Sequence, residues 1–366
     1  MASPSPTTPG HAPSTYPKSM KAWIHNSTGP PEKVLKFSSD LPTPSLPVGE
    51  EVLVKISHAA LNPGGSIMMQ ICPMMFRAKP AIPEMDFAGT IVQLGSNVPE
   101  SRNLKIGAEV FGSILVGAHI RAGKGALAEF VVVDAENVCL KPENISCEEA
   151  AGLPVAGCTA LALVDAARLE EGMKVLINGA SGGIGSMAVQ MAKSAVGESG
   201  KIIVICSKAN IEMVKGLGAD EVIDYQEHAP VHKFLATQFG NDQFDVIMDA
   251  FGIQEIYHTC AGYLKPGHSF VSVGPAMPAY SMGAILYSIG QMASNFLWPR
   301  VLGGTKRPYT QFAATASPKE MQRLADMAQN GKLKAPIDSC WEMDDVLKAY
   351  ERMLSRHARG KVVVRI

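Results

Sequence analysis

The stretch of sequence that decides the fold is Lys174–Ser186, "KVLINGASGGIGS". An apolar run leads into four glycines within seven positions, and an amphipathic segment, "IGSMAVQMAKSA" (184–195), follows. This order predicts a strand, a tight turn and a helix. Glycines let the backbone approach a pyrophosphate closely, and a helix N-terminus offers free N–H groups. The pattern favours a dinucleotide-binding turn over the alternative of a purely structural corner.

The glycine spacing is G-x-x-G-G-x-G, which differs from the plain G-x-G-x-x-G motif. The context makes the pattern specific, because a second strand, "KIIVICS" (201–207), follows the helix. We expect the turn to contribute these residues to the cofactor site: Gly179, Ser181, Gly182, Gly183, Ile184 and Gly185.

The end of that second strand predicts which nucleotide binds. An NAD site normally carries an acidic residue there, which binds the ribose hydroxyls. Here Ser207 and Lys208 follow the strand, and the next acid is Glu212. A hydroxyl and an ammonium group bind a 2′-phosphate, which a carboxylate would repel. The sequence therefore predicts NADPH rather than NADH, with a plain surface lysine as the alternative interpretation of Lys208.

Outward from this unit, strands and helices alternate from residue 146 to residue 274. Such alternation predicts βαβ units and a parallel sheet covered by helices on both faces. "SCEE" (146–149) has the form of a capping box, and "SPKEMQRLADMAQNG" (317–331) carries signals for both helix ends. From residue 21 to about residue 134 the chain instead has short strand-like runs between Gly and Pro. These runs predict a small β-rich domain without long helices.

Composition narrows the functional class. The 366 residues are 46% hydrophobic and 18% charged, and the formal net charge of −1 gives no attraction for nucleic acid. The seven cysteines include no C-x-x-C pair, so we expect neither a zinc ribbon nor a thioredoxin-like motif. Their odd number and scattered positions suit a protein of a reducing compartment. Residues 1–19 are rich in Pro, Ser and Thr and lack the features of a targeting signal. They predict a disordered tail on a cytoplasmic protein.

An apolar, Met-rich segment, "AMPAYSMGAILYSIGQMASNFLW" (276–298), follows the alternating region. Gln291 and Asn295 interrupt it, so its apolar runs fall short of the roughly 20 residues of a transmembrane span. Three interpretations stay open: a core or interface helix, a wall or lid of a lipophilic substrate pocket, and a surface that touches a membrane.

From about Lys21 to Ile366 the chain resembles the medium-chain dehydrogenase/reductase superfamily, in its zinc-free quinone oxidoreductase and enoyl reductase branch. The resemblance rests on motifs in a fixed order: "LNP", "PEMDFAGTIV", "LPVAGCTALALV", "NGASGGIG", "LGADEVIDY", "FDVIMDAFG" and "GKVVVRI". It implies an α/β protein with a Rossmann doubly wound parallel sheet plus a β-rich GroES-like domain. The implied bounds are 20–150 for the GroES-like substrate domain, completed by about 312–366, and 151–311 for the Rossmann NADPH-binding domain.

The same resemblance implies further cofactor contacts. In similar enzymes the asparagine of "LNP", here Asn62, and the threonine at Thr159 lie near the nicotinamide, where Asn62 can also position the substrate. Tyr225 of "IDY" helps to hold the 2′-phosphate in similar NADPH enzymes. The loops after two later strands place three more residues beside the ribose and nicotinamide: Phe251, Gly252 and Gly274.

The resemblance also bears on metal. Zinc alcohol dehydrogenases of the superfamily have G-H-E-x-x-G where this chain reads "EMDFAG" (84–89), so Met85 stands at the position of a zinc-binding histidine. Their zinc-binding cysteine aligns approximately with Asn62, and the four-cysteine lobe of structural zinc is missing from the sequence. We therefore expect no metal, and reduction of an activated C=C or a quinone rather than alcohol oxidation.

Two departures from the family pattern affect the mechanism. The family often reads "NPxD", but two glycines follow Pro63 here, so an acidic partner for Asn62 is missing from this motif. Many enoyl reductases carry a proton-donating tyrosine in the segment where this chain has Phe76. No catalytic acid is identified, and water is the expected source of the final proton.

The leading hypothesis is a zinc-independent, NADPH-dependent reductase of a lipophilic enone, enoyl thioester or quinone, including a tailoring enzyme of a biosynthetic pathway. Two alternatives remain open: a non-redox cyclase or isomerase on the same fold, and a sensor that binds NADPH as a structural ligand. A homodimer is usual among similar proteins, and the sequence itself leaves the oligomeric state open.

Overall fold

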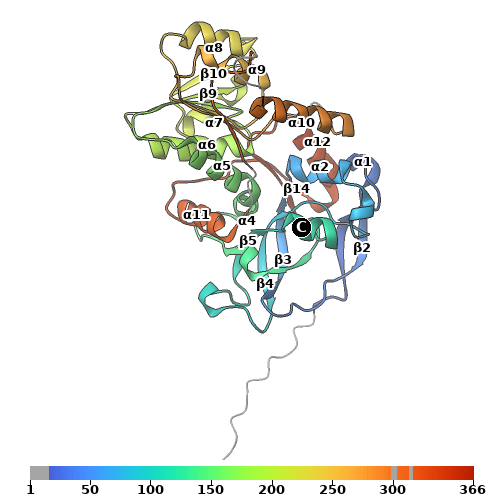
Figure 1. Ribbon diagram of the computed structural model, residues 1–366. Coiled ribbons are helices and arrows are strands. Elements are labelled where there is room, and N and C mark those ends of the chain that lie inside the picture. Colours follow the sequence, from blue (N-terminus) through green and yellow to red (C-terminus); the bar gives the residue numbers. More distant parts are fainter. Residues whose placement is uncertain (1–15, 278, 298–302, 313–315) are drawn as a thin grey trace, which may run out of the picture.

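The computed structural model describes residues 16–277, 279–297, 303–312 and 316–366. Two regions, each built around a sheet, lie next to each other, and the C-terminal strand and helix return to the region that contains the N-terminal strands (Figure 1). Of the predicted disordered tail, residues 1–19, the first 15 residues lie outside the described part of the chain. Tyr16 already packs its ring against Phe130, with the centroids 6.3 Å apart, and the first strand begins at Ser19.

The first region holds a six-stranded sheet in which every neighbouring pair of strands is parallel. In spatial order its strands are β10 (Glu221–Asp224), β9 (Lys201–Cys206), β8 (Lys174–Asn178), β11 (Val246–Asp249), β12 (Phe270–Ser272) and β13 (Tyr309–Gln311). This is the 3-2-1-4-5-6 order of a Rossmann sheet, which confirms the predicted fold class. The sixth strand, β13, was not expected, because the alternating pattern ends at residue 274.

Helices cover both faces of this sheet. Alternate residues of β8 point to opposite sides, so Val175 and Ile177 pack with α5 and α6 while Leu176 packs with α8 and α9. The prediction of a sheet covered on both faces is confirmed. The helices of this region are α5 (Pro154–Ala167), α6 (Gly183–Val196), α7 (Ile211–Gly216), α8 (Val231–Phe239), α9 (Gln254–Thr259), α10 (Met282–Leu297) and α11 (Pro318–Gln329).

The second region is the expected β-rich part, and its largest sheet has seven strands. These are β14 (Ile337–Glu342), β15 (Lys361–Arg365), β3 (Glu51–Ala60), β4 (Asp86–Leu94), β5 (Glu109–Ser113), β7 (Val138–Leu140) and β6 (Phe130–Asp134), which pairs with β3. A separate antiparallel pair consists of β1 (Ser19–Ile24) and β2 (Lys36–Pro42). Since β14 and β15 join this sheet, the C-terminal segment is part of it. The bounds of the two domains stay a prediction.

Short helices also occur in this region. They are α1 (Pro31–Val34), α2 (Pro63–Ile71), α3 (Val116–Ala122), α4 (Cys147–Gly152) and α12 (Val346–Leu354). Those at α4 and α12 agree with helical signals in the sequence, whereas α1, α2 and α3 lie between residues 21 and 134, where the sequence shows no long helical period. Proline at the first turn starts α2, whose N-cap is Asn62. Gly64 and Gly65 near the start of α2 disfavour a helix, which weakens the helical signal of this short segment.

The predicted helix ends agree with the structure. The Glu149 N–H donates to Ser146 Oγ at 3.1 Å and the Ser146 N–H donates to Glu149 Oε2 at 3.0 Å, which confirms the capping box of α4. The apolar stretch after it forms two helices rather than one, because Pro154 lacks an N–H and begins α5 as a new helix. At α11 the Glu320 N–H donates to Ser317 Oγ, as the sequence predicts.

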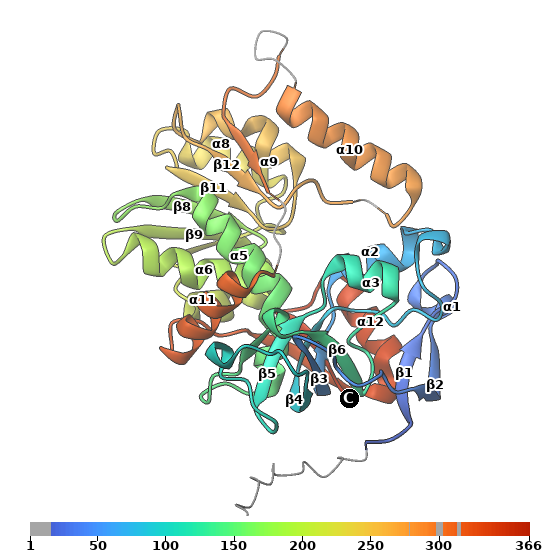
Figure 2. The ribbon, with the colours of Figure 1, turned by 60° about the horizontal axis from the view of Figure 1, so that its bottom comes forward.

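The apolar segment that the sequence singled out forms α10, a helix of 16 residues. Only Ala284 and Ser288 of it are buried, while Leu286 is 64% exposed. In Figure 2, α10 runs from the parallel-sheet region toward α2. No helix among the described residues is long and apolar enough to cross a membrane.

Candidate active site

The glycine turn joins the carboxyl end of β8 to the N-terminus of α6. Gly179 adopts a φ of +73°, which side chains rarely permit, and a Cβ on Gly185 would lie 2.2 Å from the Gly179 carbonyl oxygen. Gly182 is the N-cap of α6 and provides no capping side chain. The N–H groups of Ile184 and Gly185 in the first turn of α6 have no capping side chain, and they would donate to a pyrophosphate at the positive end of the helix dipole. These residues fit a dinucleotide.

Residues far away in the sequence hold this turn in place. Gly182 forms a bridge with Gly360, whose N–H donates to the Ser181 carbonyl at 2.9 Å. The Ser181 hydroxyl accepts a hydrogen bond from Asn210 Nδ2 at 2.8 Å. A Cβ on Gly183 would lie 3.0 Å from Cδ of Lys361, so the lysine side chain lies against the turn. Residues of the parallel-sheet region and of the β-rich region therefore both hold the glycine turn in place.

The residues expected at the 2′-phosphate gather where β9 and β10 end. The parallel pairing places Asp224 beside Cys206, and the Tyr225 N–H donates to the Cys206 carbonyl at 3.2 Å. Lys208 is exposed and Tyr225 is 39% exposed, while Ser207 is half-buried. Neighbouring chain segments at this edge of the sheet therefore carry one hydroxyl, one ammonium and one phenol group. Their contact with a cofactor stays a prediction.

The loop after β11 depends on Asp249, which the sequence analysis did not single out. This buried carboxylate accepts hydrogen bonds from Asn178 Nδ2 at 2.8 Å and from the N–H groups of Phe251 at 3.0 Å and Gly252 at 2.8 Å. A Cβ on Gly179 would lie 3.0 Å from Cβ of Phe251, so this loop borders the glycine turn. Asp249 stands directly before the loop in "FDVIMDAFG", which is a usable signal in the sequence.

Gly252 and the loop after β12 meet in the same place. A Cβ on Gly252 would lie 2.2 Å from the Gly274 carbonyl oxygen, and both glycines have φ near +100°, at +99° and +104°. The side-chain amide of Gln311, on β13, lies next to Gly274. The structure thus brings Gly179, Phe251, Gly252 and Gly274 together at the carboxyl edge of the sheet, where doubly wound folds bind ligands.

Asn62 lies in a buried polar network that links the two regions. Lys361 Nζ donates to Asn62 Oδ1 at 2.6 Å, and Asn62 Nδ2 donates to Asp86 Oδ2 at 2.9 Å. The Asn62 N–H donates to Glu84 Oε2 at 3.0 Å, and Glu84 Oε1 accepts from the Tyr350 hydroxyl at 2.7 Å. Acidic partners of Asn62 are therefore present. They come from "PEMD" instead of from the "NPxD" position that the sequence analysis found vacant.

Burial dominates the electrostatics of this network. It raises the pKa of Glu84 to about 7 and also raises the pKa of Asp86, while it lowers the pKa of Lys361. The charge of Lys361 and the hydrogen bonds from Asn62 oppose this effect, because they lower the pKa of both carboxyl groups. Because Lys361 and Asp86 occupy both ends of the Asn62 amide, this side chain is held in one orientation.

The comparisons place the chain in a family. A model described as "Alcohol dehydrogenase GroES-like domain" matches residues 49–143, and one described as "Zinc-binding dehydrogenase" matches residues 217–364. The chain is 32% identical to the trans-enoyl reductase poxH of Penicillium oxalicum, over 95% of this chain and 98% of that protein. The chain belongs to the medium-chain dehydrogenase/reductase superfamily.

Within this superfamily the enoyl and quinone reductase branch fits best. The quinone oxidoreductase of Coxiella burnetii superposes with a TM-score of 0.75 at 27% identity, covering 95% of this chain and 99% of that chain. The NADPH-dependent alkenal/one oxidoreductase of Arabidopsis thaliana is 30% identical over 96% of this chain and 81% of that protein. This medium-chain reductase is an oxidoreductase with a nicotinamide cofactor.

One family-model description names zinc, but the residues at the compared positions do not fit the ion. Met85 is buried and offers only a thioether, and the amide oxygen of Asn62 already accepts from Lys361. Catalytic zinc is bound by thiolates, imidazoles and carboxylates. The expectation of a zinc-independent reaction stays a prediction, supported by this donor set.

Thr159 lies on α5, where its hydroxyl donates to the Val155 carbonyl at 2.6 Å. The Val155 N–H in turn donates to Asp86 Oδ2 at 3.1 Å, so α5 is joined to the Asn62 network. Three participants had no local signal in the sequence: Asn210, Tyr350 and Lys361. Each of them forms a hydrogen bond with a residue 29 to 299 positions away in the sequence, and only the folded chain brings these partners close.

Proposed function

We propose that this protein is an NADPH-dependent reductase that transfers a hydride to an activated C=C of a lipophilic enone or enoyl thioester, or to a quinone. NADPH, when bound, supplies the hydride. The observation that carries the proposal is the glycine turn followed by Ser207, Lys208 and Tyr225, without an acid at the end of β9. A cationic, hydroxyl-rich edge at this point suits a 2′-phosphate.

The chain's own residues then bind and orient the reactants. The first turn of α6 holds the pyrophosphate, and the loops that carry Phe251 and Gly274 border the nicotinamide end. The Lys361–Asn62–Asp86 network fixes the opposite wall of the proposed substrate site, across from these two loops, because all three side chains are buried. Catalysis of hydride transfer to a conjugated carbon consists largely of such positioning, since conjugation already makes that carbon electrophilic. Water supplies the final proton.

Named relatives support the substrate class. Besides the trans-enoyl reductase and the alkenal/one oxidoreductase, the 2-methylene-furan-3-one reductase of Solanum lycopersicum is 31% identical over 96% of this chain. Each of these names denotes reduction of a conjugated compound. No observation in the structure favours the non-redox or the sensor alternative.

Exposed apolar side chains support a lipophilic substrate. Met75 is 83% exposed and Phe76 63% exposed, both on the short helical turn Met74–Phe76 that follows α2. On α10, Leu286 and Ile289 are 64% and 53% exposed. We assign α10 as a wall of the substrate cleft, which was one of its three interpretations.

The test is consumption of NADPH by the purified protein with a panel of enones, enoyl thioesters and quinones, and with saturated ketones as controls. We expect turnover of conjugated substrates only, with products that have gained two hydrogens by mass. Tight binding of NADPH without turnover of any conjugated substrate would contradict the proposal and favour the sensor.

A further inference from the structure

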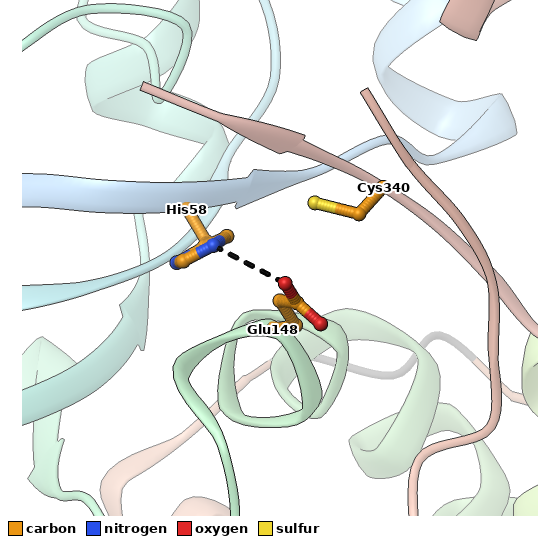
Figure 3. A group of neighbouring side chains, drawn as sticks. All are labelled: His58, Glu148 and Cys340. Atoms are coloured by element: carbon orange, nitrogen blue, oxygen red, sulfur yellow. Dashed lines mark ion pairs between the residues drawn. The ribbon is translucent and has the colours of Figure 1, made fainter. Parts of the chain in front are cut away.

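A cluster of three metal-ligating side chains lies outside the site described above. His58 on β3 pairs with Arg365 on β15, which in turn pairs with Glu342 on β14. Side chains of directly paired residues point to the same face of a sheet, and so does Cys340, two residues before Glu342. Helix α4 packs against β3, β14 and β15. Its first turn places Glu148 beside His58 and Cys340 (Figure 3).

The atoms of this cluster have the spacing of a metal site. A ring nitrogen of His58, Cys340 Sγ and a Glu148 carboxylate oxygen all lie within 4.8 Å of one another, and His58 Nε2 is 3.7 Å from Glu148 Oε1. Tetrahedral zinc with bonds of roughly 2.0–2.3 Å separates its ligand atoms by about 3.3–3.8 Å. Small side-chain adjustments would therefore bring all three atoms onto one ion.

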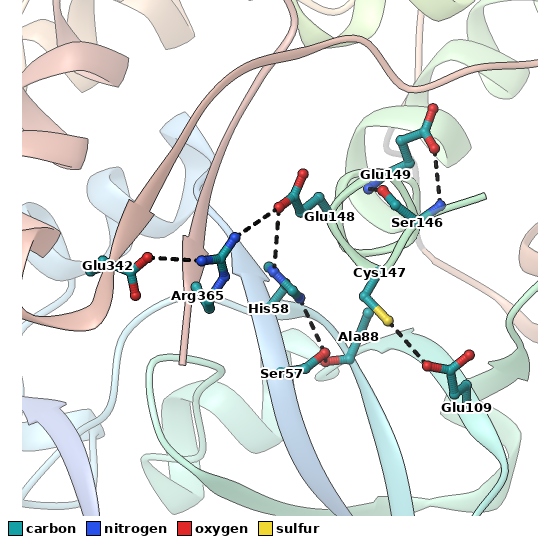
Figure 4. A network of polar contacts seen from close by, with 10 residues as sticks. All are labelled: Ser57, His58, Ala88, Glu109, Ser146, Cys147, Glu148, Glu149, Glu342 and Arg365. Carbon is teal, nitrogen blue, oxygen red and sulfur yellow. Dashed lines mark hydrogen bonds and ion pairs between the residues drawn. The ribbon is translucent and has the colours of Figure 1, made fainter.

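The hydrogen bonds of His58 prepare it to be a ligand. The Ser57 hydroxyl donates its only hydrogen to the Ala88 carbonyl at 3.2 Å, and we therefore assign the imidazole as the donor at His58 Nδ1, which lies 3.2 Å from the same hydroxyl (Figure 4). Nε2 then carries the lone pair, and it is buried without a hydrogen-bond partner. A neutral ring agrees with burial, which lowers the pKa of His58. A histidine that ligates a metal typically donates its other N–H in this way.

This arrangement leaves a lone pair of His58 facing a carboxylate oxygen of Glu148, whose charge is offset only by the half-exposed Arg365, and a cation bound between the two ligands would remove the repulsion. We propose that His58, Glu148 and Cys340 form a Zn²⁺ site with water as the fourth ligand, one that neither the fold family's catalytic position nor the proposed reaction uses. The mixture of nitrogen, sulfur and carboxylate oxygen favours Zn²⁺ over Mg²⁺ or Ca²⁺, which prefer oxygen ligands alone. Binding displaces the thiol proton of Cys340 to solvent. The bound ion would tie α4 to β3 and β14.

Arg365 is the cation that competes for this position. Its Nη2 lies 3.3 Å from Glu148 Oε1, while Nη1 lies 3.0 Å from Glu342 Oε1 (Figure 4). Since Arg365 is half-exposed and keeps Glu342 as a partner, it can release Glu148 when the ion binds. Removal of this guanidinium should therefore strengthen metal binding rather than weaken it.

The experiment uses the full-length chain without an affinity tag, stripped with a chelator and then titrated with Zn²⁺ in competition with a chromophoric chelator. Co²⁺ is the spectroscopic probe, because a thiolate bound to it gives a charge-transfer band in the near ultraviolet. We expect one ion per chain and this band in the parent protein. Cys340→Ser should lose the band and at least tenfold in Zn²⁺ affinity, and His58→Gln should lose affinity as well. Arg365→Gln should bind Zn²⁺ more tightly than the parent protein.

Cys147→Ser is the matched control, because this neighbouring thiol points toward Glu109, 3.5 Å away, rather than to the cluster (Figure 4). It should keep both the band and the affinity. Cys340 is exposed, so its replacement by serine does not disturb a core. Absence of a stoichiometric ion in the parent protein, or a cobalt band that survives in Cys340→Ser, would overturn the proposal. Reductase activity is not part of the readout, so failure here is separate from failure of the proposed function.

Discussion

At the scale of single residues, the proposed preference for NADPH rests on a few side chains at the edge of the parallel sheet. Ser207 and Lys208 follow β9, where an NAD-binding protein would carry an acid, and Tyr225 follows the neighbouring strand β10. Sequence reasoning identified Ser207 and Lys208 because the end of a strand is a local feature. It placed Tyr225 through the "IDY" motif.

Lys208→Glu tests the cofactor assignment. A carboxylate there would repel the 2′-phosphate and remove a charge-assisted hydrogen bond, which is worth about 1.5–3 kcal/mol. We expect kcat/KM for NADPH to fall roughly 10- to 100-fold, with little change for NADH. Lys215→Glu, on the exposed side of α7, is the matched control and should leave the preference as it is. An unchanged NADPH to NADH ratio in Lys208→Glu would mean that Lys208 is a plain surface lysine.

Glu84 makes folding stability depend on pH. Burial raises its pKa from 4.5 to about 7, so the folded state favours the protonated carboxyl. The contribution of Glu84 to stability is then fully present below about pH 4.5 and is lost as the pH rises through about 7, in total on the order of 3 kcal/mol. Glu84→Gln keeps an acceptor for Tyr350 and does not titrate.

Urea unfolding at a series of pH values measures this effect. Relative to the parent protein, the free energy of unfolding of Glu84→Gln should rise by about 3 kcal/mol between about pH 4.5 and about pH 8. Glu136→Gln, an exposed position, should show no such trend. Parallel curves for Glu84→Gln and the parent protein would show that Glu84 titrates normally.

At the scale of elements, the strand–turn–helix unit of β8 and α6 is determined by local sequence. Two of its glycines are required by the local backbone: Gly179 by its positive φ of +73°, and Gly185 because a Cβ there would lie 2.2 Å from the Gly179 carbonyl oxygen. The capping box of α4 and the N-cap of α11 were predicted from the sequence for the same reason: a cap involves residues three positions apart. β13 could not be predicted this way, since only three residues pair with β12.

Gly185→Ala tests the turn as a binding element. The added Cβ would lie 2.2 Å from a backbone oxygen, so the turn must shift and its N–H groups move away from the pyrophosphate. We expect the dissociation constant for NADPH, measured by fluorescence titration, to rise at least tenfold, equivalent to about 1.4 kcal/mol. Gly216→Ala, where a Cβ would meet nothing within 4 Å, should bind NADPH normally. Normal binding by Gly185→Ala would argue for a purely structural corner.

At the scale of the whole molecule, Lys361 connects the two sheets. It belongs to β15 of the β-rich region, lies against Gly183 of the glycine turn, and donates to Asn62. The network is thus placed where the two regions meet, next to the expected cofactor.

Lys361→Met tests this connection. The substitution leaves the Asp86 carboxylate buried without its nearby cation, which typically costs about 3–5 kcal/mol. The free energy of unfolding in urea should fall by that order. Lys55→Met, an exposed lysine of β3, should leave stability nearly unchanged. A small loss in Lys361→Met would indicate that Asp86 takes up a proton at little cost.

Helix α10 is the second feature that acts at this scale, since it reaches from the parallel-sheet region toward α2 (Figure 2). If it borders the substrate, Leu286→Ser should raise KM for long-chain enones by about tenfold, because burial of a leucine contributes about 1.5–3 kcal/mol. KM for NADPH should stay the same. Leu46→Ser is the control, because Leu46 lies outside α10 and is also more than half exposed. If KM were unchanged for enones of every chain length, α10 would not border the substrate, and a core or interface helix or a membrane contact would be the remaining interpretations.

The sequence by itself determined the alternating strands and helices, the glycine turn and the membership of the protein in the class that binds a dinucleotide. These depend on periodicity and on steric limits that act over a few neighbouring residues. Only the tertiary structure decided the partners of Asn62 and the meeting of His58, Glu148 and Cys340. Those contacts depend on which strands pair and in which register, so residues hundreds of positions apart become neighbours for reasons that no local pattern contains. The acidic residues that complete the Asn62 network were visible in the sequence, but their role became apparent only when β4 and β15 were placed beside β3.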